Sequence, residues 1–398
     1  MNHFFRSISC AAAICIVVPF SGADEPNARF EVEAMLRDMA ASCIAGDGAA
    51  YLRHVASGDQ EFRNEQKYFA NDLTKKHAAE CAFTLADLRE SEASATGELT
   101  IEWTMPEGRG RKVSFDARFL KEDGQWKFAG ETWAMHEAPG VMVLHDPGLD
   151  ELAERVVTAF GDVRAHVEDG FSLADKELPK KTQKIKLYGT MKHLQASISL
   201  SYVDGLSGWN EPGESIKILS SPRTGVNQLR PLLAHEYGHV ATFELGAQSN
   251  SMPWWVLEGV AELSSEKWAR KPDGLVKAWA EKGRLAPWEE ITDFETVKGK
   301  WRGHVYTQGH HMLGFISDKW EREGRVAWLS AMALGQTIDE ASKSALGVSF
   351  AQLDAQWRAS LPAQKPEEPA ATGDEKPDGK ADPKMEPKSE PQPVMPPK

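Results

Sequence analysis

The sequence has no excess of basic residues and, beyond its first 23 positions, no long apolar run. It contains 46 Lys and Arg residues against 59 Asp and Glu residues, which gives a formal net charge of -13. Proteins that bind nucleic acid normally present a basic face, so this balance argues against nucleic acid as a partner. A helix needs about 20 consecutive apolar residues to cross a bilayer. We therefore expect no transmembrane span in the mature chain.

Residues 1–23 are the exception, because they have the pattern of a secretory signal peptide. Arg6 provides a basic start, residues 8–20 are almost wholly apolar, and small residues at 21–23 precede Asp24. We expect cleavage before Asp24 and export to the periplasm, the cell envelope or the extracellular space. The alternative is that the segment stays attached as an anchor.

Cysteine is scarce, with four residues in the whole chain, and two of them lie within the predicted signal. The other two are Cys43 and Cys81, and neither has the spacing of a metal site. In an exported protein, two cysteines in one domain favour a disulfide bond between them. The alternative is a pair of buried free thiols.

Residues 24–140 change from helical to strand periodicity. Apolar residues recur at helical spacing from Phe30 to Cys43, and more helix is expected around residues 62–73. From Leu99 onward apolar and polar residues alternate, and Asp123-Gly124 marks a hairpin turn. This order, ending in FLKEDGQWKFAGETW, resembles the cone-shaped α+β fold of the nuclear transport factor and scytalone dehydratase group. A fold does not give a function by itself, and no catalytic pair is evident in this region, so we expect an accessory or binding domain.

Residues 147–361 have mainly helical patterning. An amphipathic helix is expected to begin near Leu149, strands are expected within 184–190 and 214–220, and helices dominate from residue 228 onward. The sequence therefore predicts an α+β protein, in which a cone-like α+β domain precedes a mainly α-helical domain with a small β-sheet.

Residues 362–398 form a tail of different composition. They hold ten of the 22 prolines, together with Lys, Glu and Asp, and contain no aromatic residue. Such a segment has almost nothing to bury, so we expect it to be disordered.

The central motif is HEYGH at residues 235–239. Residues four apart share one face of a helix, so His235 and His239 can bind one zinc ion, and Glu236 between them can act as the general base on water. Glu258 follows after eighteen residues. A catalytic zinc takes three protein ligands and keeps one open position. We therefore predict His235, His239 and Glu258 as the zinc ligands.

Glu262 lies four residues beyond Glu258, on the same helix face. Imidazoles that bind a metal usually donate their second N–H group to a carboxylate or a carbonyl. We predict that Glu262 accepts such a hydrogen bond from His235. The alternative is an ordinary solvated glutamate.

The motifs HEYGH and EGVAE, eighteen residues apart, resemble those of the gluzincin metallopeptidases, as in the aminopeptidase N and thermolysin branches. PWWVLEGVAEL is similar to the corresponding segment of a bacterial gluzincin-like group. The resemblance covers roughly residues 150–361 and implies a zinc-dependent hydrolase acting on a peptide or protein. It also implies that Tyr306, in a Y-x-x-G segment, stabilises the oxyanion. His304, His310 and His311 lie nearby and are alternatives for that role.

The sequence differs from the gluzincin pattern in one segment that bears on the choice of substrate. Aminopeptidase-N-type enzymes carry a G-x-M-E-N segment, whose place is taken here by SGWNEPGESIKIL at residues 207–219. This difference argues against exopeptidase action. The strand around Ile216 and Ile218 is expected either to pair with an extended peptide at a sheet edge or to be buried. Two other functions remain as alternatives: a zinc-containing binding protein without peptidase activity, and an envelope structural or interaction protein.

Overall fold

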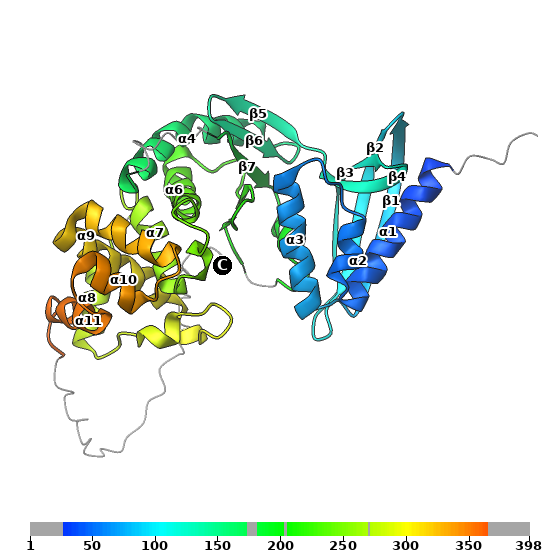
Figure 1. The fold of residues 1–398 in the computed structure, drawn as a ribbon. Helices are drawn as coiled ribbons and strands as arrows, with labels where there is room; N and C mark the ends of the chain where they lie inside the picture. Colours follow the sequence, from blue (N-terminus) through cyan, green and yellow to red (C-terminus); the bar gives the residue numbers. More distant parts are fainter. Residues whose placement is uncertain (1–26, 173–180, 203–204, 270, 365–398) are drawn as a thin grey trace, which may run out of the picture.

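The computed structural model describes residues 27–172, 181–202, 205–269 and 271–364. The predicted signal peptide lies outside these residues, and so does the predicted tail from residue 365 onward. Figure 1 shows two structural units, the first in blue and cyan and the second in green to orange. Both contain helices and strands, which confirms the expected α+β class.

The first unit consists of three helices followed by an antiparallel sheet, as the change of periodicity predicts. Its four strands follow one another across the sheet in chain order. Alternate residues of the second strand, such as Leu99, Ile101 and Trp103, are buried and form a core with the helices. The elements are α1 (Ala28–Ala45), α2 (Gly48–Arg53), α3 (Gln60–Lys75), β1 (Glu80–Ser91), β2 (Ser94–Thr104), β3 (Arg111–Glu122) and β4 (Gln125–Glu131).

The second unit begins with a five-stranded sheet of order β5-β6-β7-β9-β8. The three central strands are parallel, and the two outer strands are antiparallel to their neighbours. Helix α4 follows β6 and packs against it. The elements are β5 (Ala134–Ala138), β6 (Val141–His145), α4 (Asp150–Gly170), β7 (Gln183–Tyr188), α5 (Met191–Ile198), β8 (Gly208–Trp209) and β9 (Ile216–Leu219).

The rest of the second unit is helical, as expected. None of the helices within the described residues is long and apolar enough to cross a membrane. The helices are α6 (Val226–Phe243), α7 (Trp254–Ser265), α8 (Asp273–Glu281), α9 (Arg302–Ala333), α10 (Ile338–Leu346) and α11 (Phe350–Ala359), with short 3-10 helices η1 (Ser249–Ser251), η2 (Trp288–Ile291) and η3 (Gly299–Trp301).

The strand arrangement differs from the sequence-based expectation in two places. The expected boundary at residue 140 cuts through the β5–β6 hairpin, because β5 pairs with β6 in the second sheet. The sheet of the first unit ends at Glu131. The strand containing Ile216 and Ile218 is not an edge strand, since β7 and β8 flank it on either side. The edge of the sheet next to β9 is β8, which has two residues.

Cys43 and Cys81 are free cysteines in the structure, so the predicted disulfide is not formed there. The two side chains nevertheless lie in contact. A hydrogen bond with Cys81, together with burial, raises the pKa of the Cys43 thiol well above its ordinary value. The structure therefore has two neighbouring free thiols, of which Cys43 is buried, as the alternative expected, and Cys81 is half-buried.

A buried ionic network joins the two units. Glu65 of α3 lies 2.5 Å from the Lys186 ammonium of β7 and 3.9 Å from that of Lys217 in β9. Lys217 also lies 2.8 Å from Glu214. Burial alone raises the pKa of Glu65, but the charges of Lys186 and Lys217 outweigh it and lower that pKa to about 2. Breaking such a buried network leaves uncompensated charges. The network therefore fixes α3 against the second sheet.

His193 of α5 forms a second link between the units. Its ring nitrogens lie 3.7 Å from Glu131 of the first unit and 3.2 Å from Asp146 of the second. Burial lowers the pKa of His193, but hydrogen bonds and the charges of these two carboxylates outweigh it and raise the pKa to about 9. Three aromatic rings pack against the imidazole, those of Phe115, Trp133 and Tyr188.

These contacts predict a pH dependence of stability. The pKa of His193 in the folded chain exceeds its value of about 6.5 in an unfolded chain. Its contribution is therefore fully present below about pH 6.5 and is lost as the pH rises through 9. Between about pH 6.5 and 9 the free energy of unfolding of the wild type should fall on the order of 2–3 kcal/mol further than that of His193→Gln, which has no imidazole to titrate. Denaturant unfolding at several pH values measures this. Identical pH profiles of the two proteins would contradict the assignment.

Candidate metal centre

Helix α6 carries the two histidines and lies against α7, which carries the two glutamates. The approach of the helices is close, because a Cβ atom added at Gly238 would lie 2.9 Å from the Ser264 Oγ and 3.1 Å from the Ala261 Cα. The glycine of the HEYGH motif thus allows α7 to pack on the face of α6 that presents the imidazoles. Leu229 and Leu233, which precede His235 on α6, are buried in the core of the second unit.

The structure brings His235, His239 and Glu258 together, as predicted. The Nε2 atoms of His235 and His239 lie 3.3 Å and 3.5 Å from the Glu258 Oε2. Ligand atoms at about 2.0–2.1 Å from a tetrahedral zinc ion are about 3.3 Å apart, so the spacing fits a bound cation. All three side chains are buried, and this group of residues can hold a metal ion.

The hydrogen bonding of the three ligand atoms supports the same interpretation. Among the described residues, the Nε2 atoms of His235 and His239 and the Oε2 of Glu258 are buried and have no hydrogen-bond partner. Buried polar atoms without partners are rare in proteins and require an explanation. A cation at their point of convergence supplies one.

Two further side chains orient the ligands. Glu262 lies with its Oε1 3.2 Å from the Nδ1 of His235, where we expected it. Trp254 donates a hydrogen bond of 2.7 Å from its indole nitrogen to the Oε1 of Glu258, which leaves Oε2 for the metal. Trp254 was not predicted as a site residue, although its position four residues before Glu258 on a helix was a usable signal.

Glu236 lies beside the ligands and is fully buried, with no hydrogen-bond partner for either carboxylate oxygen among the described residues. Burial raises the pKa of Glu236 to about 7, against the opposing effect of His235 and His239. Strand β8 passes directly over this carboxyl group. A Cβ atom added at Gly208 would lie 2.0 Å from the Glu236 Oε1, so a side chain at this position would displace the carboxyl group.

Tyr306 of α9 lies next to Trp254, the residue that holds Glu258. The crossing of α7 and α9 is possible because Gly259 and Gly309 face each other: a Cβ atom at Gly259 would lie 2.6 Å from the Gly309 carbonyl carbon. The Tyr306 ring packs edge-on against Trp254, with 5.8 Å between centroids. Burial, followed by the negative charge of Glu258, raises the pKa of Tyr306 well above its ordinary value. The phenol therefore keeps its proton and can donate it in a hydrogen bond.

The three other histidines that we considered for this role are engaged elsewhere. Each has a ring nitrogen within hydrogen-bond distance of a group outside the ligand set. His304 faces the carbonyl oxygen of Arg284, His310 faces the carboxylate of Glu266, and His311 accepts a hydrogen bond from Trp357.

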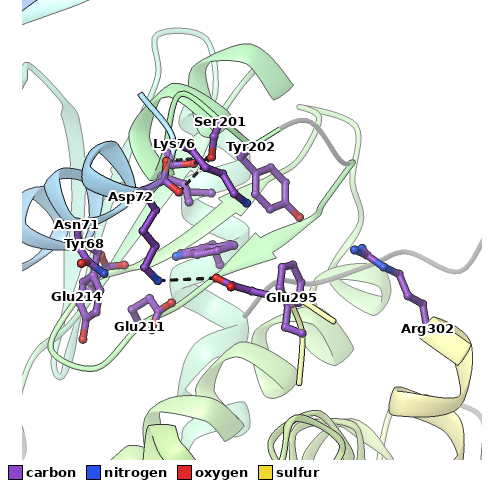
Figure 2. Close-up of a pocket in the computed structure, with 15 residues that line it drawn as sticks. Tyr68, Asn71, Asp72, Lys76, Ser201, Tyr202, Glu211, Glu214, Glu295 and Arg302 are labelled. Carbon is purple, nitrogen blue, oxygen red and sulfur yellow. Dashed lines mark hydrogen bonds and ion pairs between the residues drawn. The ribbon is translucent and has the colours of Figure 1, made fainter. Parts of the chain in front are cut away.

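A cleft of about 300 Å³ lies between the two units, next to β8 (Figure 2). Trp209 of β8 lines it, directly after the glycine that covers Glu236. Phe294 also lines it and packs edge-on against Trp254 at 4.9 Å between centroids. The cleft is therefore lined by neighbours of the metal centre, whereas the three ligands, Glu236 and Tyr306 are not among its lining residues. Its far wall belongs to α3 of the first unit, with Tyr68, Asn71, Asp72 and Lys75, and to Lys76 directly after that helix.

The comparisons with known proteins assign no family. No family model and no curated protein match the sequence. Among solved structures, the chain is similar to Rv3472, a Mycobacterium tuberculosis protein of unknown function, at 16% identity and a TM-score of 0.21, covering 25% of this chain and 66% of that one. It is also similar to RPA3114, a SEC-C motif containing protein from Rhodopseudomonas palustris, at 18% identity and a TM-score of 0.22, covering 26% and 83%. At such TM-scores neither likeness assigns a fold or a function.

The geometry predicts a role for Glu262 in metal affinity. Removing the hydrogen-bond partner of a metal-bound imidazole typically weakens metal binding about 10- to 100-fold. We expect Glu262→Ala to raise the zinc dissociation constant by that factor, measured by competition with a chromophoric chelator. Glu266→Ala, one turn further along, is the matched control and should leave it unchanged. Equal affinities of wild type and Glu262→Ala would show that the carboxylate does not support the ligand.

Proposed function

We propose that the protein is an exported, zinc-dependent metallopeptidase that hydrolyses peptide bonds with a water molecule activated by Glu236. The observation that carries the proposal is the convergence of three buried ligand atoms, those of His235, His239 and Glu258, which have no hydrogen-bond partner among the described residues. Two imidazoles and one carboxylate form the ligand set of catalytic zinc in peptidases, where a fourth position stays open. The resemblance of the HEYGH and EGVAE segments to the gluzincin motifs supports the same reaction.

The residues of the chain have distinct tasks in this reaction. Zinc held by the three ligands would polarise the scissile carbonyl group and make water more acidic. Glu236 takes the proton of the attacking water and delivers it to the leaving amine. Tyr306 donates a hydrogen bond to the oxygen on which negative charge develops. No covalent bond to the chain is required, and the described cysteines lie in the first unit, away from α6.

The substrate is accommodated in the cleft beside β8. Because β8 is an edge strand, its free side can pair with the backbone of an extended peptide. The aromatic side chains of Tyr202, Trp209 and Phe294 line the adjoining cleft and suit an apolar side chain of the substrate. Since α3 forms the opposite wall, the first unit contributes directly to substrate binding. It is fixed there by the buried network around Glu65.

The assignment of Glu236 and Tyr306 predicts variants that keep the metal and lose turnover. We expect Glu236→Gln to lower kcat by a factor on the order of 10²–10⁴, and Tyr306→Phe by about 10²–10³. The measurement is cleavage of a mixed peptide library followed by mass spectrometry, with metal content determined on the same samples. A folded Glu236→Gln protein that cleaves as fast as wild type would contradict the mechanism. A zinc-loaded wild type that cleaves no peptide would favour the non-peptidolytic binding protein.

The position of α3 predicts a change in substrate binding alone. Asn71 is exposed on α3 and lines the cleft, so Asn71→Trp fills part of it without touching the metal ligands. We expect KM to rise roughly 5- to 30-fold, equivalent to about 1–2 kcal/mol, while kcat stays unchanged. Lys67→Trp, one turn earlier on the exposed face, is the matched control. If both variants keep the wild-type KM, the first unit does not bind substrate, whatever the activity of the metal centre.

A further inference from the structure

A second group of metal-ligating side chains lies at the junction of β5, β6 and α4. It consists of His136, His145 and Asp150, whose ligand atoms all lie within 4.8 Å of one another. The two histidines come from neighbouring strands. His136 pairs with Val143, and His145 is two residues further along the same strand, so both imidazoles project from one face of the sheet. Their ring centroids are 5.3 Å apart.

The state of His145 is the observation that points to a ligand. Its Nδ1 lies 2.9 Å from the backbone carbonyl oxygen of Asp146. A carbonyl can only accept, so Nδ1 carries the proton, and the neutral ring then has its lone pair on Nε2. This Nε2 is buried and has no hydrogen-bond partner among the described residues, on a side chain that is 0% exposed. The same arrangement, with a carbonyl on one nitrogen, orients histidines that bind metals.

We propose that His136, His145 and Asp150 form a second metal site, which takes a first-row divalent cation such as Zn²⁺. Imidazole nitrogen and carboxylate oxygen are suitable ligands for such ions. The distance from His145 Nε2 to Asp150 Oδ1 is 4.0 Å, against about 3.3 Å around a tetrahedral ion. Asp150 is 68% exposed, so rotation of its side chain closes this gap. Water completes the coordination on the exposed side.

The position of the second metal site indicates that a bound cation would stabilise the fold. The β5–β6 hairpin follows directly from the first unit, and Asp150 is the first residue of α4, which packs across the second sheet. A cation bound by all three residues ties the hairpin to the start of that helix. Two carboxylates in the first turn of α4, Asp150 and Glu151, provide negative charge where the helix end would otherwise repel a cation. The proposal does not depend on the proposed peptidase activity.

The experiment measures Zn²⁺ binding to the full chain after the first site has been removed. We expect His239→Ala to bind one Zn²⁺ ion per chain, determined by elemental mass spectrometry after dialysis and by calorimetric titration. Adding His136→Ala or His145→Asn should abolish this binding or weaken it at least ten-fold. Asparagine is chosen at position 145 because its amide nitrogen can keep the bond to the Asp146 carbonyl. His77→Ala, an exposed histidine outside the group, is the control and should change nothing.

The outcomes separate the two metal sites. If His239→Ala does not fold, the wild type should bind two Zn²⁺ ions and His136→Ala one. A His239→Ala protein that binds no Zn²⁺, or binds it equally well after the changes at 136 and 145, would overturn the second site. A single ion in the wild type that is lost with His136→Ala would support the second site and contradict the metal centre on α6.

Discussion

Helix α7 lies closer to its two neighbours than helices with ordinary side chains allow, and the metal centre depends on this packing. Gly238 allows α7 to contact α6, and Gly259 faces Gly309 where α7 crosses α9. These contacts set the separation of the imidazoles from Glu258 and bring Tyr306 against Trp254, which bonds to Glu258. The glycines of HEYGH, EGVAE and Y-x-x-G therefore have one physical role, which is to let three helix backbones meet around a buried polar site.

Such a site is unfavourable without a ligand, because polar atoms are withdrawn from water and left unpaired. The two Nε2 atoms, the Oε2 of Glu258 and both oxygens of Glu236 are in this state among the described residues. Apolar packing around the site, such as that of Trp255 against Trp288, offsets part of the free-energy cost of burying these polar atoms. A bound cation would remove most of the remaining penalty. The rule that a buried polar group needs a partner also applies between the two units, where the buried charges of Glu65 and Lys186 neutralise each other.

Much of the centre could be predicted from the sequence, because helical spacing alone places residues four apart on one face. This rule was sufficient for His235 with His239 and for Glu258 with Glu262. It did not reveal β8, whose two residues show no periodicity, nor the assignment of β5 to the second sheet, which depends on long-range pairing. Lys186 and Lys217 alternate with apolar residues, a pattern that predicts exposure to solvent. They are buried because α3 packs over them, and local sequence does not reveal this packing. The bond expected between Cys43 and Cys81 is absent in the structure, although they are neighbours.

The metal centre is tested most directly by a crystal structure of the zinc-loaded protein with diffraction data collected on both sides of the zinc absorption edge. We expect an anomalous peak about 2.0–2.2 Å from the Nε2 atoms of His235 and His239 and from the Oε2 of Glu258. We also expect Glu236 and Tyr306 to face the open side of the ion. A zinc-saturated crystal without density at that position, or with a hydrogen-bonded water linking the three atoms, would show that these residues do not hold a metal ion.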